Sequence, residues 1–208
     1  MPNLEDGFTA GRYGNLQKYL NPNPVQQWLL RRFHQRILGL VRSTGAQRIL
    51  DVGCGEGFTM RELREDGVQA TMVGVDLSPG ALAWNQAHGM ARSPLGVVDV
   101  HHLPFPDNSF DLVLCLEVLE HLPDSGVGLR ELLRLSREHV LVSVPHEPFF
   151  RGANLLRGKH LSALGNDPEH MHNYSGQAFR CLVAAQAEVV WHGYRFPWQI
   201  ALACKAKS

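Results

Sequence analysis

The chain has 208 residues and 44% apolar content, which is enough for one compact domain with a full core. Lys plus Arg and Asp plus Glu both number 20, so the chain lacks the overall positive field that nucleic-acid-binding proteins usually carry. No apolar run approaches the length of a membrane span, and the start does not resemble a signal peptide. The four cysteines show no CxxC spacing and are interpreted as reduced thiols. We therefore expect a cytoplasmic protein with a small-molecule partner and with no nucleic-acid or membrane partner; the oligomeric state stays open.

Residues 1–44 are predicted to form an N-terminal segment before the first strand. Met1–Pro24 is rich in Gly, Asn and Pro and is expected to wrap the surface. A first amphipathic helix follows, with apolar residues at helical spacing: Val25, Trp28, Leu29, Phe33, Ile37 and Val41. Arg31, Arg32 and Arg36 fall on its other side, as a basic patch or a solvated face, and we interpret them as a solvated face.

The segment Arg48–Gly57 (RILDVGCGEG) begins the second predicted unit, residues 45–208. An apolar strand with Asp51 near its end leads into glycines at every second position, which let the backbone turn sharply and approach a ligand. The dinucleotide pattern GxGxxG would need a glycine at position 58, where this chain has Phe58. The spacing favours a nucleoside-cofactor loop of another kind, and a simple strand-to-helix turn is the alternative.

A second apolar strand, Thr71–Asp76 (TMVGVD), ends in a carboxylate 23 residues after the first glycine. In doubly wound sheets a carboxylate at this place accepts ribose hydroxyls. The alternative role is the N-cap of the next helix, but Ser78 followed by Pro79 is a better start signal. Asp76 is therefore predicted to hold a ribose.

Two further strands follow in the same alternating pattern. The third is predicted at Gly96–Val100 (GVVDV). The prolines of Leu103–Asp111 (LPFPDNSFD) then favour an irregular turn. Phe110 and Leu112–Leu116 form a fourth strand, apolar throughout and therefore buried on both faces. Strands alternating with helices predict an α/β domain with a parallel sheet and helices on both faces.

These segments, in this order, resemble the class I S-adenosylmethionine-dependent methyltransferases, particularly the type 11 group, over about residues 45 to 145. The run LPFPDNSFD matches that family letter for letter. The resemblance implies a single Rossmann-like domain whose seven-stranded, mostly parallel sheet has an antiparallel last strand. It also implies S-adenosylmethionine as the cofactor and a small-molecule acceptor, with a hydroxyl as the expected acceptor group.

The resemblance also assigns roles in cofactor binding. In the family, the carboxylate at Asp51 helps to place the methionine ammonium, Asp99 and Val100 hold the adenine, and Glu117 borders the methionine. The segment before the first strand covers the site in related enzymes, which makes Tyr19, Arg12 and Tyr13 candidate lid residues. The implied cofactor-binding residues are Asp51, Gly53, Cys54, Gly55, Gly57, Asp76, Leu77, Asp99, Val100, Leu116 and Glu117.

Glu117, Glu120 and His121 (EVLEHL) follow the fourth strand and are predicted to share one face of a helix, at i, i+3 and i+4. Quinone-biosynthesis O-methyltransferases and enzymes that methylate the terminal 2′-hydroxyl of small RNAs share this arrangement, and both groups are linked to divalent metals. In the RNA group a later histidine completes the set; His170 matches it, with His172 as a competing choice. The tentative metal ligands are Glu117, Glu120, His121 and His170.

Related methyltransferases that bind no metal keep the same residues, and there His121 packs beneath the substrate pocket. His146 follows the fifth strand (HVLVSVP), where a side chain points into the catalytic crevice of a doubly wound sheet. His121 and His146 are therefore the candidate catalytic bases, with a purely structural role as the alternative for His146.

The C-terminal third is predicted to supply the substrate pocket and to close the sheet. An insertion at residues 147–173 is expected to build the pocket, Ser175 to cap a helix through Ala185, and residues 188–194 and 198–205 to pair antiparallel. Three functions remain open: a small-molecule methyltransferase, a metal-assisted RNA-terminal 2′-O-methyltransferase, and a non-catalytic cofactor-binding partner subunit. We favour the first, because the chain is neutral and the carboxylates of the cofactor site are all present.

Overall fold

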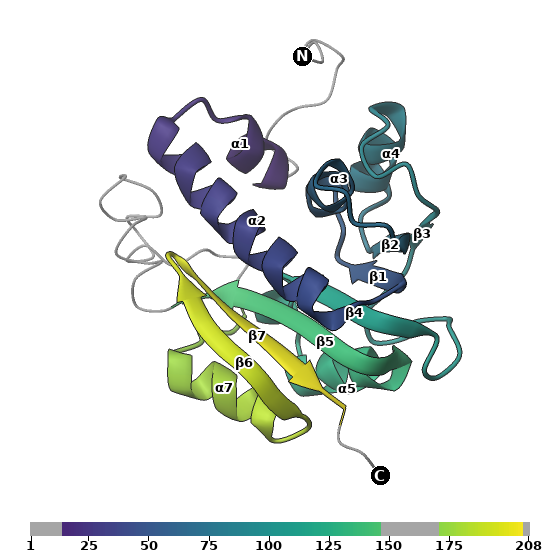
Figure 1. Cartoon of the computed structure of the whole chain (residues 1–208), viewed down its shortest axis with the longest axis vertical. Coiled ribbons are helices and arrows are strands. Elements are labelled where there is room, and N and C mark those ends of the chain that lie inside the picture. Colours follow the sequence, from purple (N-terminus) through teal and green to yellow (C-terminus); the bar gives the residue numbers. More distant parts are fainter. Residues whose placement is uncertain (1–13, 147–170, 206–208) are drawn as a thin grey trace.

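The computed structural model describes residues 14–146 and 171–205. Its sheet has seven strands in the order β3-β2-β1-β4-β5-β7-β6 (Figure 1). The strands are β1 (Arg48–Val52), β2 (Thr71–Asp76), β3 (Leu95–Val97), β4 (Phe110–Leu116), β5 (Ser136–Pro145), β6 (Glu188–Arg195) and β7 (Trp198–Cys204). The helices are α1 (Gly14–Leu20), α2 (Pro24–Thr44), α3 (Phe58–Glu65), α4 (Pro79–Ala87), α5 (Ser125–Leu135) and α7 (Gly176–Ala184), with a 3₁₀ turn η1 (Leu119–His121).

Strands β1 to β5 pair in parallel, whereas β7 pairs antiparallel with both of its neighbours. This confirms the predicted fold class, including the antiparallel last strand. The second and fourth strands begin and end where the sequence predicts them, and the first lies in the predicted segment Arg48–Gly57. The third strand is shorter than predicted and ends at Val97, because Asp99 turns the chain by accepting hydrogen bonds from the backbone and ring nitrogens of His101.

Two apolar clusters cover the two faces of the sheet. Helices α2, α3 and α4 contribute to one cluster and α5 and α7 to the other. The central strand β4 supplies both, because Leu112 and Leu114 face α2 while Val113 and Cys115 face α5, all of them fully buried. This two-sided burial explains why the Leu112–Leu116 part of β4 is apolar throughout. None of the helices in the described ranges is both long and apolar enough to cross a bilayer.

Parallel pairing brings the carboxyl ends of five strands to one edge of the sheet. From one end of that edge to the other, the chain positions there are Asp99 after β3, Asp76 at the end of β2, Gly53 after β1, Glu117 after β4 and His146 after β5. Adjacent strands in a sheet lie about 4.8 Å apart, so these positions form a row, here called the track, that extends across the carboxyl ends of five neighbouring strands. Ligands of doubly wound sheets bind along this edge.

Ser78 caps α4 as the sequence predicts, since its hydroxyl accepts a hydrogen bond from the backbone N–H of Ala81. Replacing Ser78 with alanine removes this acceptor, and we expect a loss of about 1 kcal/mol in the free energy of unfolding. Chemical denaturation of the variant measures the loss. Ser78→Thr keeps the acceptor and is the matched control; equal losses in the two variants would show that the cap contributes nothing.

Candidate functional site

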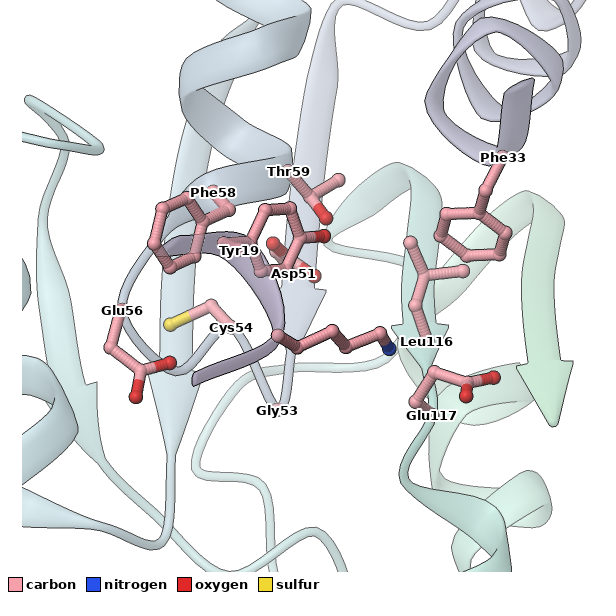
Figure 2. Close-up of a pocket in the computed structure, with 11 residues that line it drawn as sticks. Tyr19, Phe33, Asp51, Gly53, Cys54, Glu56, Phe58, Thr59, Leu116 and Glu117 are labelled. Atoms are coloured by element: carbon pink, nitrogen blue, oxygen red, sulfur yellow. The ribbon is translucent and has the colours of Figure 1, made fainter. Parts of the chain in front are cut away.

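A pocket lies at the carboxyl ends of β1 and β4, and residues of α1, α2 and α3 also line it (Figure 2). It combines residues from the glycine loop with residues from the N-terminal segment. The lining residues are Lys18, Tyr19, Phe33, Asp51, Gly53, Cys54, Glu56, Phe58, Thr59, Leu116 and Glu117. Five of the predicted cofactor residues therefore share one pocket: Asp51, Gly53, Cys54, Leu116 and Glu117.

The glycine loop adopts a conformation that other residues disfavour. Gly53 has a φ of 76° and Gly57 a φ of 82°. A Cβ atom at Gly53 would clash with the side chain of Val118, and one at Gly57 would clash with the side-chain amide of Asn85. The loop is fixed to β2, because Gly53 and Cys54 both donate backbone hydrogen bonds to the carbonyl of Val75. The glycines therefore serve both the left-handed backbone and the close packing around the pocket.

Asp51 provides a buried negative group at the base of the pocket. The residue is 3% exposed, and its Oδ2 has no hydrogen-bond partner among the described residues. Burial, and secondarily the charge of Asp76, raise the pKa of Asp51 to about 7. A buried carboxylate oxygen without a partner is costly, and a cationic or hydrogen-bond-donating ligand would remove that cost.

Asp76 connects the end of β2 to the glycine loop. Its Oδ2 accepts a hydrogen bond from the backbone N–H of Gly55 at 2.8 Å, and its Oδ1 accepts one from the backbone N–H of Ser78 at 2.8 Å. A carboxylate has about four lone-pair sites, so each oxygen can still accept a ligand hydroxyl. The sequence-based reasoning predicted the ligand role of Asp76 but not its function in fixing the loop.

The other predicted cofactor residues lie outside this pocket. Leu77 is exposed beside Asp76, as expected for a residue that would cover a ligand bound at the sheet edge. Asp99 is paired with His101, with its side chain half exposed, and Val100 is buried in the core. Asp99 and Val100 lie beyond the end of β3 on the track described above, and their roles at an adenine stay predictions.

Helix α1 contributes Tyr19 and Lys18 to the lining of the pocket. Tyr19 stacks on Phe58 with ring centroids 4.0 Å apart, and its hydroxyl lies 2.6 Å from Nε2 of His34. Burial lowers the pKa of His34 to about 4, so His34 is neutral near pH 7 and forms a neutral hydrogen bond with the tyrosine hydroxyl. Tyr19 lies where the resemblance predicts a lid residue, whereas Arg12 and Tyr13 lie outside the described residues.

Lys18 and Glu56 are pocket residues that the sequence-based reasoning missed. Lys18 reaches the pocket from α1, and its Nζ also lies 4.7 Å from the ring centroid of Trp198. Glu56 is almost fully buried between two of the loop glycines. Its place inside the GxGxG motif was a usable signal; Lys18 had only its position beside Tyr19.

The prediction that Glu117, Glu120 and His121 share a helical face is wrong. Glu117 has a left-handed φ of 59°, η1 spans three residues, and the next helix begins only at Ser125. The reason is Pro123, which disfavours helical geometry at the preceding residue; Leu122 has an extended ψ of 137°. The positive φ at Glu117 is strained backbone of the kind that gathers at functional sites.

The three residues therefore have different surroundings. His121, at the end of η1, is partly buried, donates its backbone N–H to the carbonyl of Val118 and does not line the pocket. Glu117 lines the pocket, and its Oε1 accepts a hydrogen bond from the hydroxyl of Ser143 at 3.0 Å. Burial raises the pKa of Glu117, and the charge of Lys18 opposes that rise. Glu120 is 1% exposed, and its backbone carbonyl accepts hydrogen bonds from the N–H groups of Met171 and His172.

The described residues contain no group of three or more His, Cys, Asp or Glu positioned to hold a metal ion. His170, the fourth tentative ligand, and residues 147–170 of the predicted substrate insertion lie outside the described residues. The competing His172 places its Nε2 3.4 Å from the carbonyl oxygen of Pro123.

His146 stands at the carboxyl end of β5 as predicted, but it does not line the pocket. Its backbone N–H donates to the carbonyl of Pro197, and its ring packs on Tyr194 with centroids 4.4 Å apart. Burial, and then the charge of His192, lower its pKa. The ring therefore contacts the β6–β7 hairpin, and its role as a base stays a prediction.

Comparisons with known proteins agree with the fold. Residues 50–143 match the family model described as a methyltransferase domain. A ubiquinone biosynthesis O-methyltransferase from Azorhizobium caulinodans is 38% identical over 115 residues, covering 52% of this chain and 45% of the relative. A norajmaline N-methyltransferase from Rauvolfia serpentina is 28% identical over 154 residues, covering 70% of this chain and 50% of the relative. The chain thus spans half or less of the length of these relatives.

Among solved structures, magnesium protoporphyrin IX methyltransferase from Synechocystis with bound SAH superimposes with a TM-score of 0.67. The match covers 88% of each chain at 19% sequence identity and so concerns the fold. The matched residues 50–143 include the second half of β1, the glycine loop, Asp76 and the whole of β4. Over residues 50–143, a little under half of its length, the chain thus matches the methyltransferase-domain family.

Proposed function

We propose that the protein is an S-adenosylmethionine-dependent methyltransferase that methylates a hydroxyl group of a small molecule. The observation that carries this proposal is the pairing of opposite charges in one pocket. Asp51 offers a buried oxygen without a partner, and Lys18 offers a cation from α1. An amino-acid end, with its ammonium and carboxylate, is the ligand group that needs both.

The residues present fit the cofactor along the whole sheet edge. Asp51 would hold the methionine ammonium and Lys18 the methionine carboxylate. Asp76, one strand further along, would accept the ribose hydroxyls, and Asp99, beyond β3, would receive the adenine. The order of the strands thus matches the order of groups in an elongated nucleoside cofactor.

When bound, the cofactor supplies a methyl group on a cationic sulfur, which a nucleophile attacks in line. The chain's own contribution is to position the reactants and to exclude water. Tyr19 and Phe58 stack over the pocket, and Phe33 and Leu116 give it apolar walls. A general base such as His121 or His146 would contribute about 10²- to 10⁴-fold by removing the acceptor proton.

The relatives support methyl transfer without fixing the acceptor atom or the acceptor molecule. The Azorhizobium relative is named an O-methyltransferase and the Rauvolfia relative an N-methyltransferase. We do not carry the metal-assisted RNA function forward, because Glu117 and Glu120 do not share the helical face on which it depended.

Lys18→Met is expected to raise the dissociation constant for S-adenosylmethionine by roughly 10-fold or more, because one charge-assisted hydrogen bond is lost. Lys18→Arg keeps the charge and should restore most of the affinity. Arg31→Met on neighbouring α2 is the control for a general change in charge, because Arg31 is exposed and does not line this pocket. Equal affinities in Lys18→Met and the wild type would remove Lys18 from the site.

Methyl transfer itself is tested with methyl-labelled S-adenosylmethionine and a panel of phenols, catechols, carboxylic acids and amines. We expect label on a hydroxyl compound, in chelator-treated protein as well as in untreated protein. Asp76→Ala provides the inactive control. Cofactor binding with no labelled product from any acceptor class would favour a non-catalytic partner subunit, and label on amines alone would contradict the hydroxyl assignment.

A further inference from the structure

The N-terminal part of the chain is strongly basic although the whole chain is neutral. Residues 7–50 contain seven Lys or Arg and no Asp or Glu. Four of the seven are arginines of α2, which packs against the edge strand β6 (Figure 1). The sequence predicts that Arg31, Arg32 and Arg36 form a solvated face of this helix. The structure adds a cavity and aromatic residues to it.

A second pocket lies between α2 and the turn that joins β6 to β7. Trp28, Leu29 and Arg32 line it from the helix, and Tyr194, Arg195 and Phe196 line it from the hairpin. It encloses about 340 Å³, including its open mouth. The rings of Phe33 and Trp198, both almost fully buried and 4.8 Å apart, belong to the core near this pocket, and Phe33 lines the cofactor pocket.

Three arginines lie at or beside this second pocket: Arg32 and Arg195 line it, and Arg36 lies one helical turn from Arg32 on α2. The guanidinium of Arg32 lies 4.7 Å from the ring centroid of Trp28, and that of Arg36 lies 5.0 Å from the ring centroid of Trp191. Burial, and then the charges of Arg36 and Arg32, lower the pKa of Arg195. In the described part of the chain none of the three arginines forms an ion pair with an acid. Gathered like charges favour the binding of an anion.

The aromatic residues of this pocket are unusually open to solvent. Trp28 is 49% exposed, Tyr194 46% and Phe196 52%. Covering such surface is favourable at roughly 25 cal/mol for each Å² removed from water. Flat rings beside guanidinium groups suit a ligand that is both planar and negatively charged.

We propose that this second pocket binds a small organic anion with a flat apolar body, such as an aryl carboxylate or an aryl phosphate. Arg32 and Arg195 pair with the anionic group, and Trp28 and Phe196 cover the body of the ligand. The site is separate from the cofactor pocket and does not depend on the proposed methyl transfer.

Calorimetric titration with 2-naphthoate and with 2-naphthyl phosphate tests the proposal. We expect one-to-one binding of at least one of them. Arg32→Gln and Arg195→Gln are each expected to weaken it about tenfold or more, because each removes a charge-assisted contact. Arg31→Gln is the matched control. It makes the same charge change at the residue that directly precedes Arg32 in α2, and Arg31 does not line this pocket. The neutral 2-naphthalenemethanol should bind much more weakly than either anion.

Failure to bind either probe up to millimolar concentration would overturn the proposal, and so would an equal loss of affinity in Arg31→Gln. Co-sedimentation with phosphatidylglycerol vesicles, lost in Arg32→Gln while neither soluble probe binds, would assign the patch to a lipid surface and would also overturn it. S-adenosylmethionine affinity is measured in the same variants and should not change. A failure of this site therefore stays distinguishable from a failure of the cofactor assignment.

Discussion

Asp76→Ala is expected to raise the dissociation constant for S-adenosylmethionine by roughly 100-fold or more. Two ribose hydroxyls donating to a charged carboxylate are worth about 1.5–3 kcal/mol each. The same carboxylate holds the backbone N–H groups of Gly55 and Ser78, so the substitution also loosens the glycine loop. Calorimetric titration gives the affinity, and denaturation of the ligand-free variant gives the cost to the fold.

Asp124→Ala is the control that separates the proposed ribose contact of Asp76 from its hydrogen bonds to the backbone. Asp124 also accepts a backbone N–H, that of Val127 at the start of α5, and it does not line the cofactor pocket. We expect Asp124→Ala to lose about 1 kcal/mol of stability with no change in cofactor affinity. An unchanged dissociation constant in Asp76→Ala would remove the ribose assignment.

The second large effect is a pH dependence of cofactor binding that depends on Asp51. Its pKa is about 7, raised first by burial and then by the charge of Asp76. Only the charged carboxylate attracts the methionine ammonium, so affinity should fall up to about tenfold for each pH unit below 7. Asp51→Asn should bind weakly and with a nearly flat profile between pH 5 and 7. A parallel fall in both proteins would place the responsible proton elsewhere.

The same group makes an opposite contribution to the stability of the ligand-free protein. Because the folded-state pKa lies above the unfolded value of 3.8, the folded state binds the extra proton. The stability that this proton contributes is complete below about pH 4 and is lost as the pH rises to about 7, at about 1.4 kcal/mol for each pH unit. Asp51→Asn should therefore be more stable than the wild type at pH 8. If Asp51→Asn is more stable than the wild type but binds the cofactor less tightly, the buried charge is retained for function and not for stability.

The sequence was sufficient for the fold and for the positions of Asp51 and Asp76 in their strands. The strand around Asp51 and the strand ending at Asp76 have apolar runs of the right length, and Ser78 with Pro79 marks the following helix by local chemistry alone. Signals of this kind depend only on residues that are close together in the chain, so they can be recognised from the sequence alone.

The segment after β4 shows where local reasoning fails. The i, i+3, i+4 spacing of Glu117, Glu120 and His121 is typical of a helix. The positive φ at Glu117 and the proline at position 123 nevertheless limit the helical segment to the three residues of η1. Lys18 was missed for a different reason. Its place in the pocket results from the packing of Tyr19 on Phe58, a contact between residues far apart in sequence.

The central claim is that the pocket formed by Asp51, Lys18 and the glycine loop holds the amino-acid end of S-adenosylmethionine. Calorimetric titration of chelator-treated protein near pH 7, repeated in buffers with different ionisation enthalpies, tests it most directly. The account predicts one-to-one binding with release of protons, because the ammonium lowers the pKa of Asp51, and Asp51→Asn should lose that release. Absence of binding, or binding with the same proton release in Asp51→Asn, would contradict it.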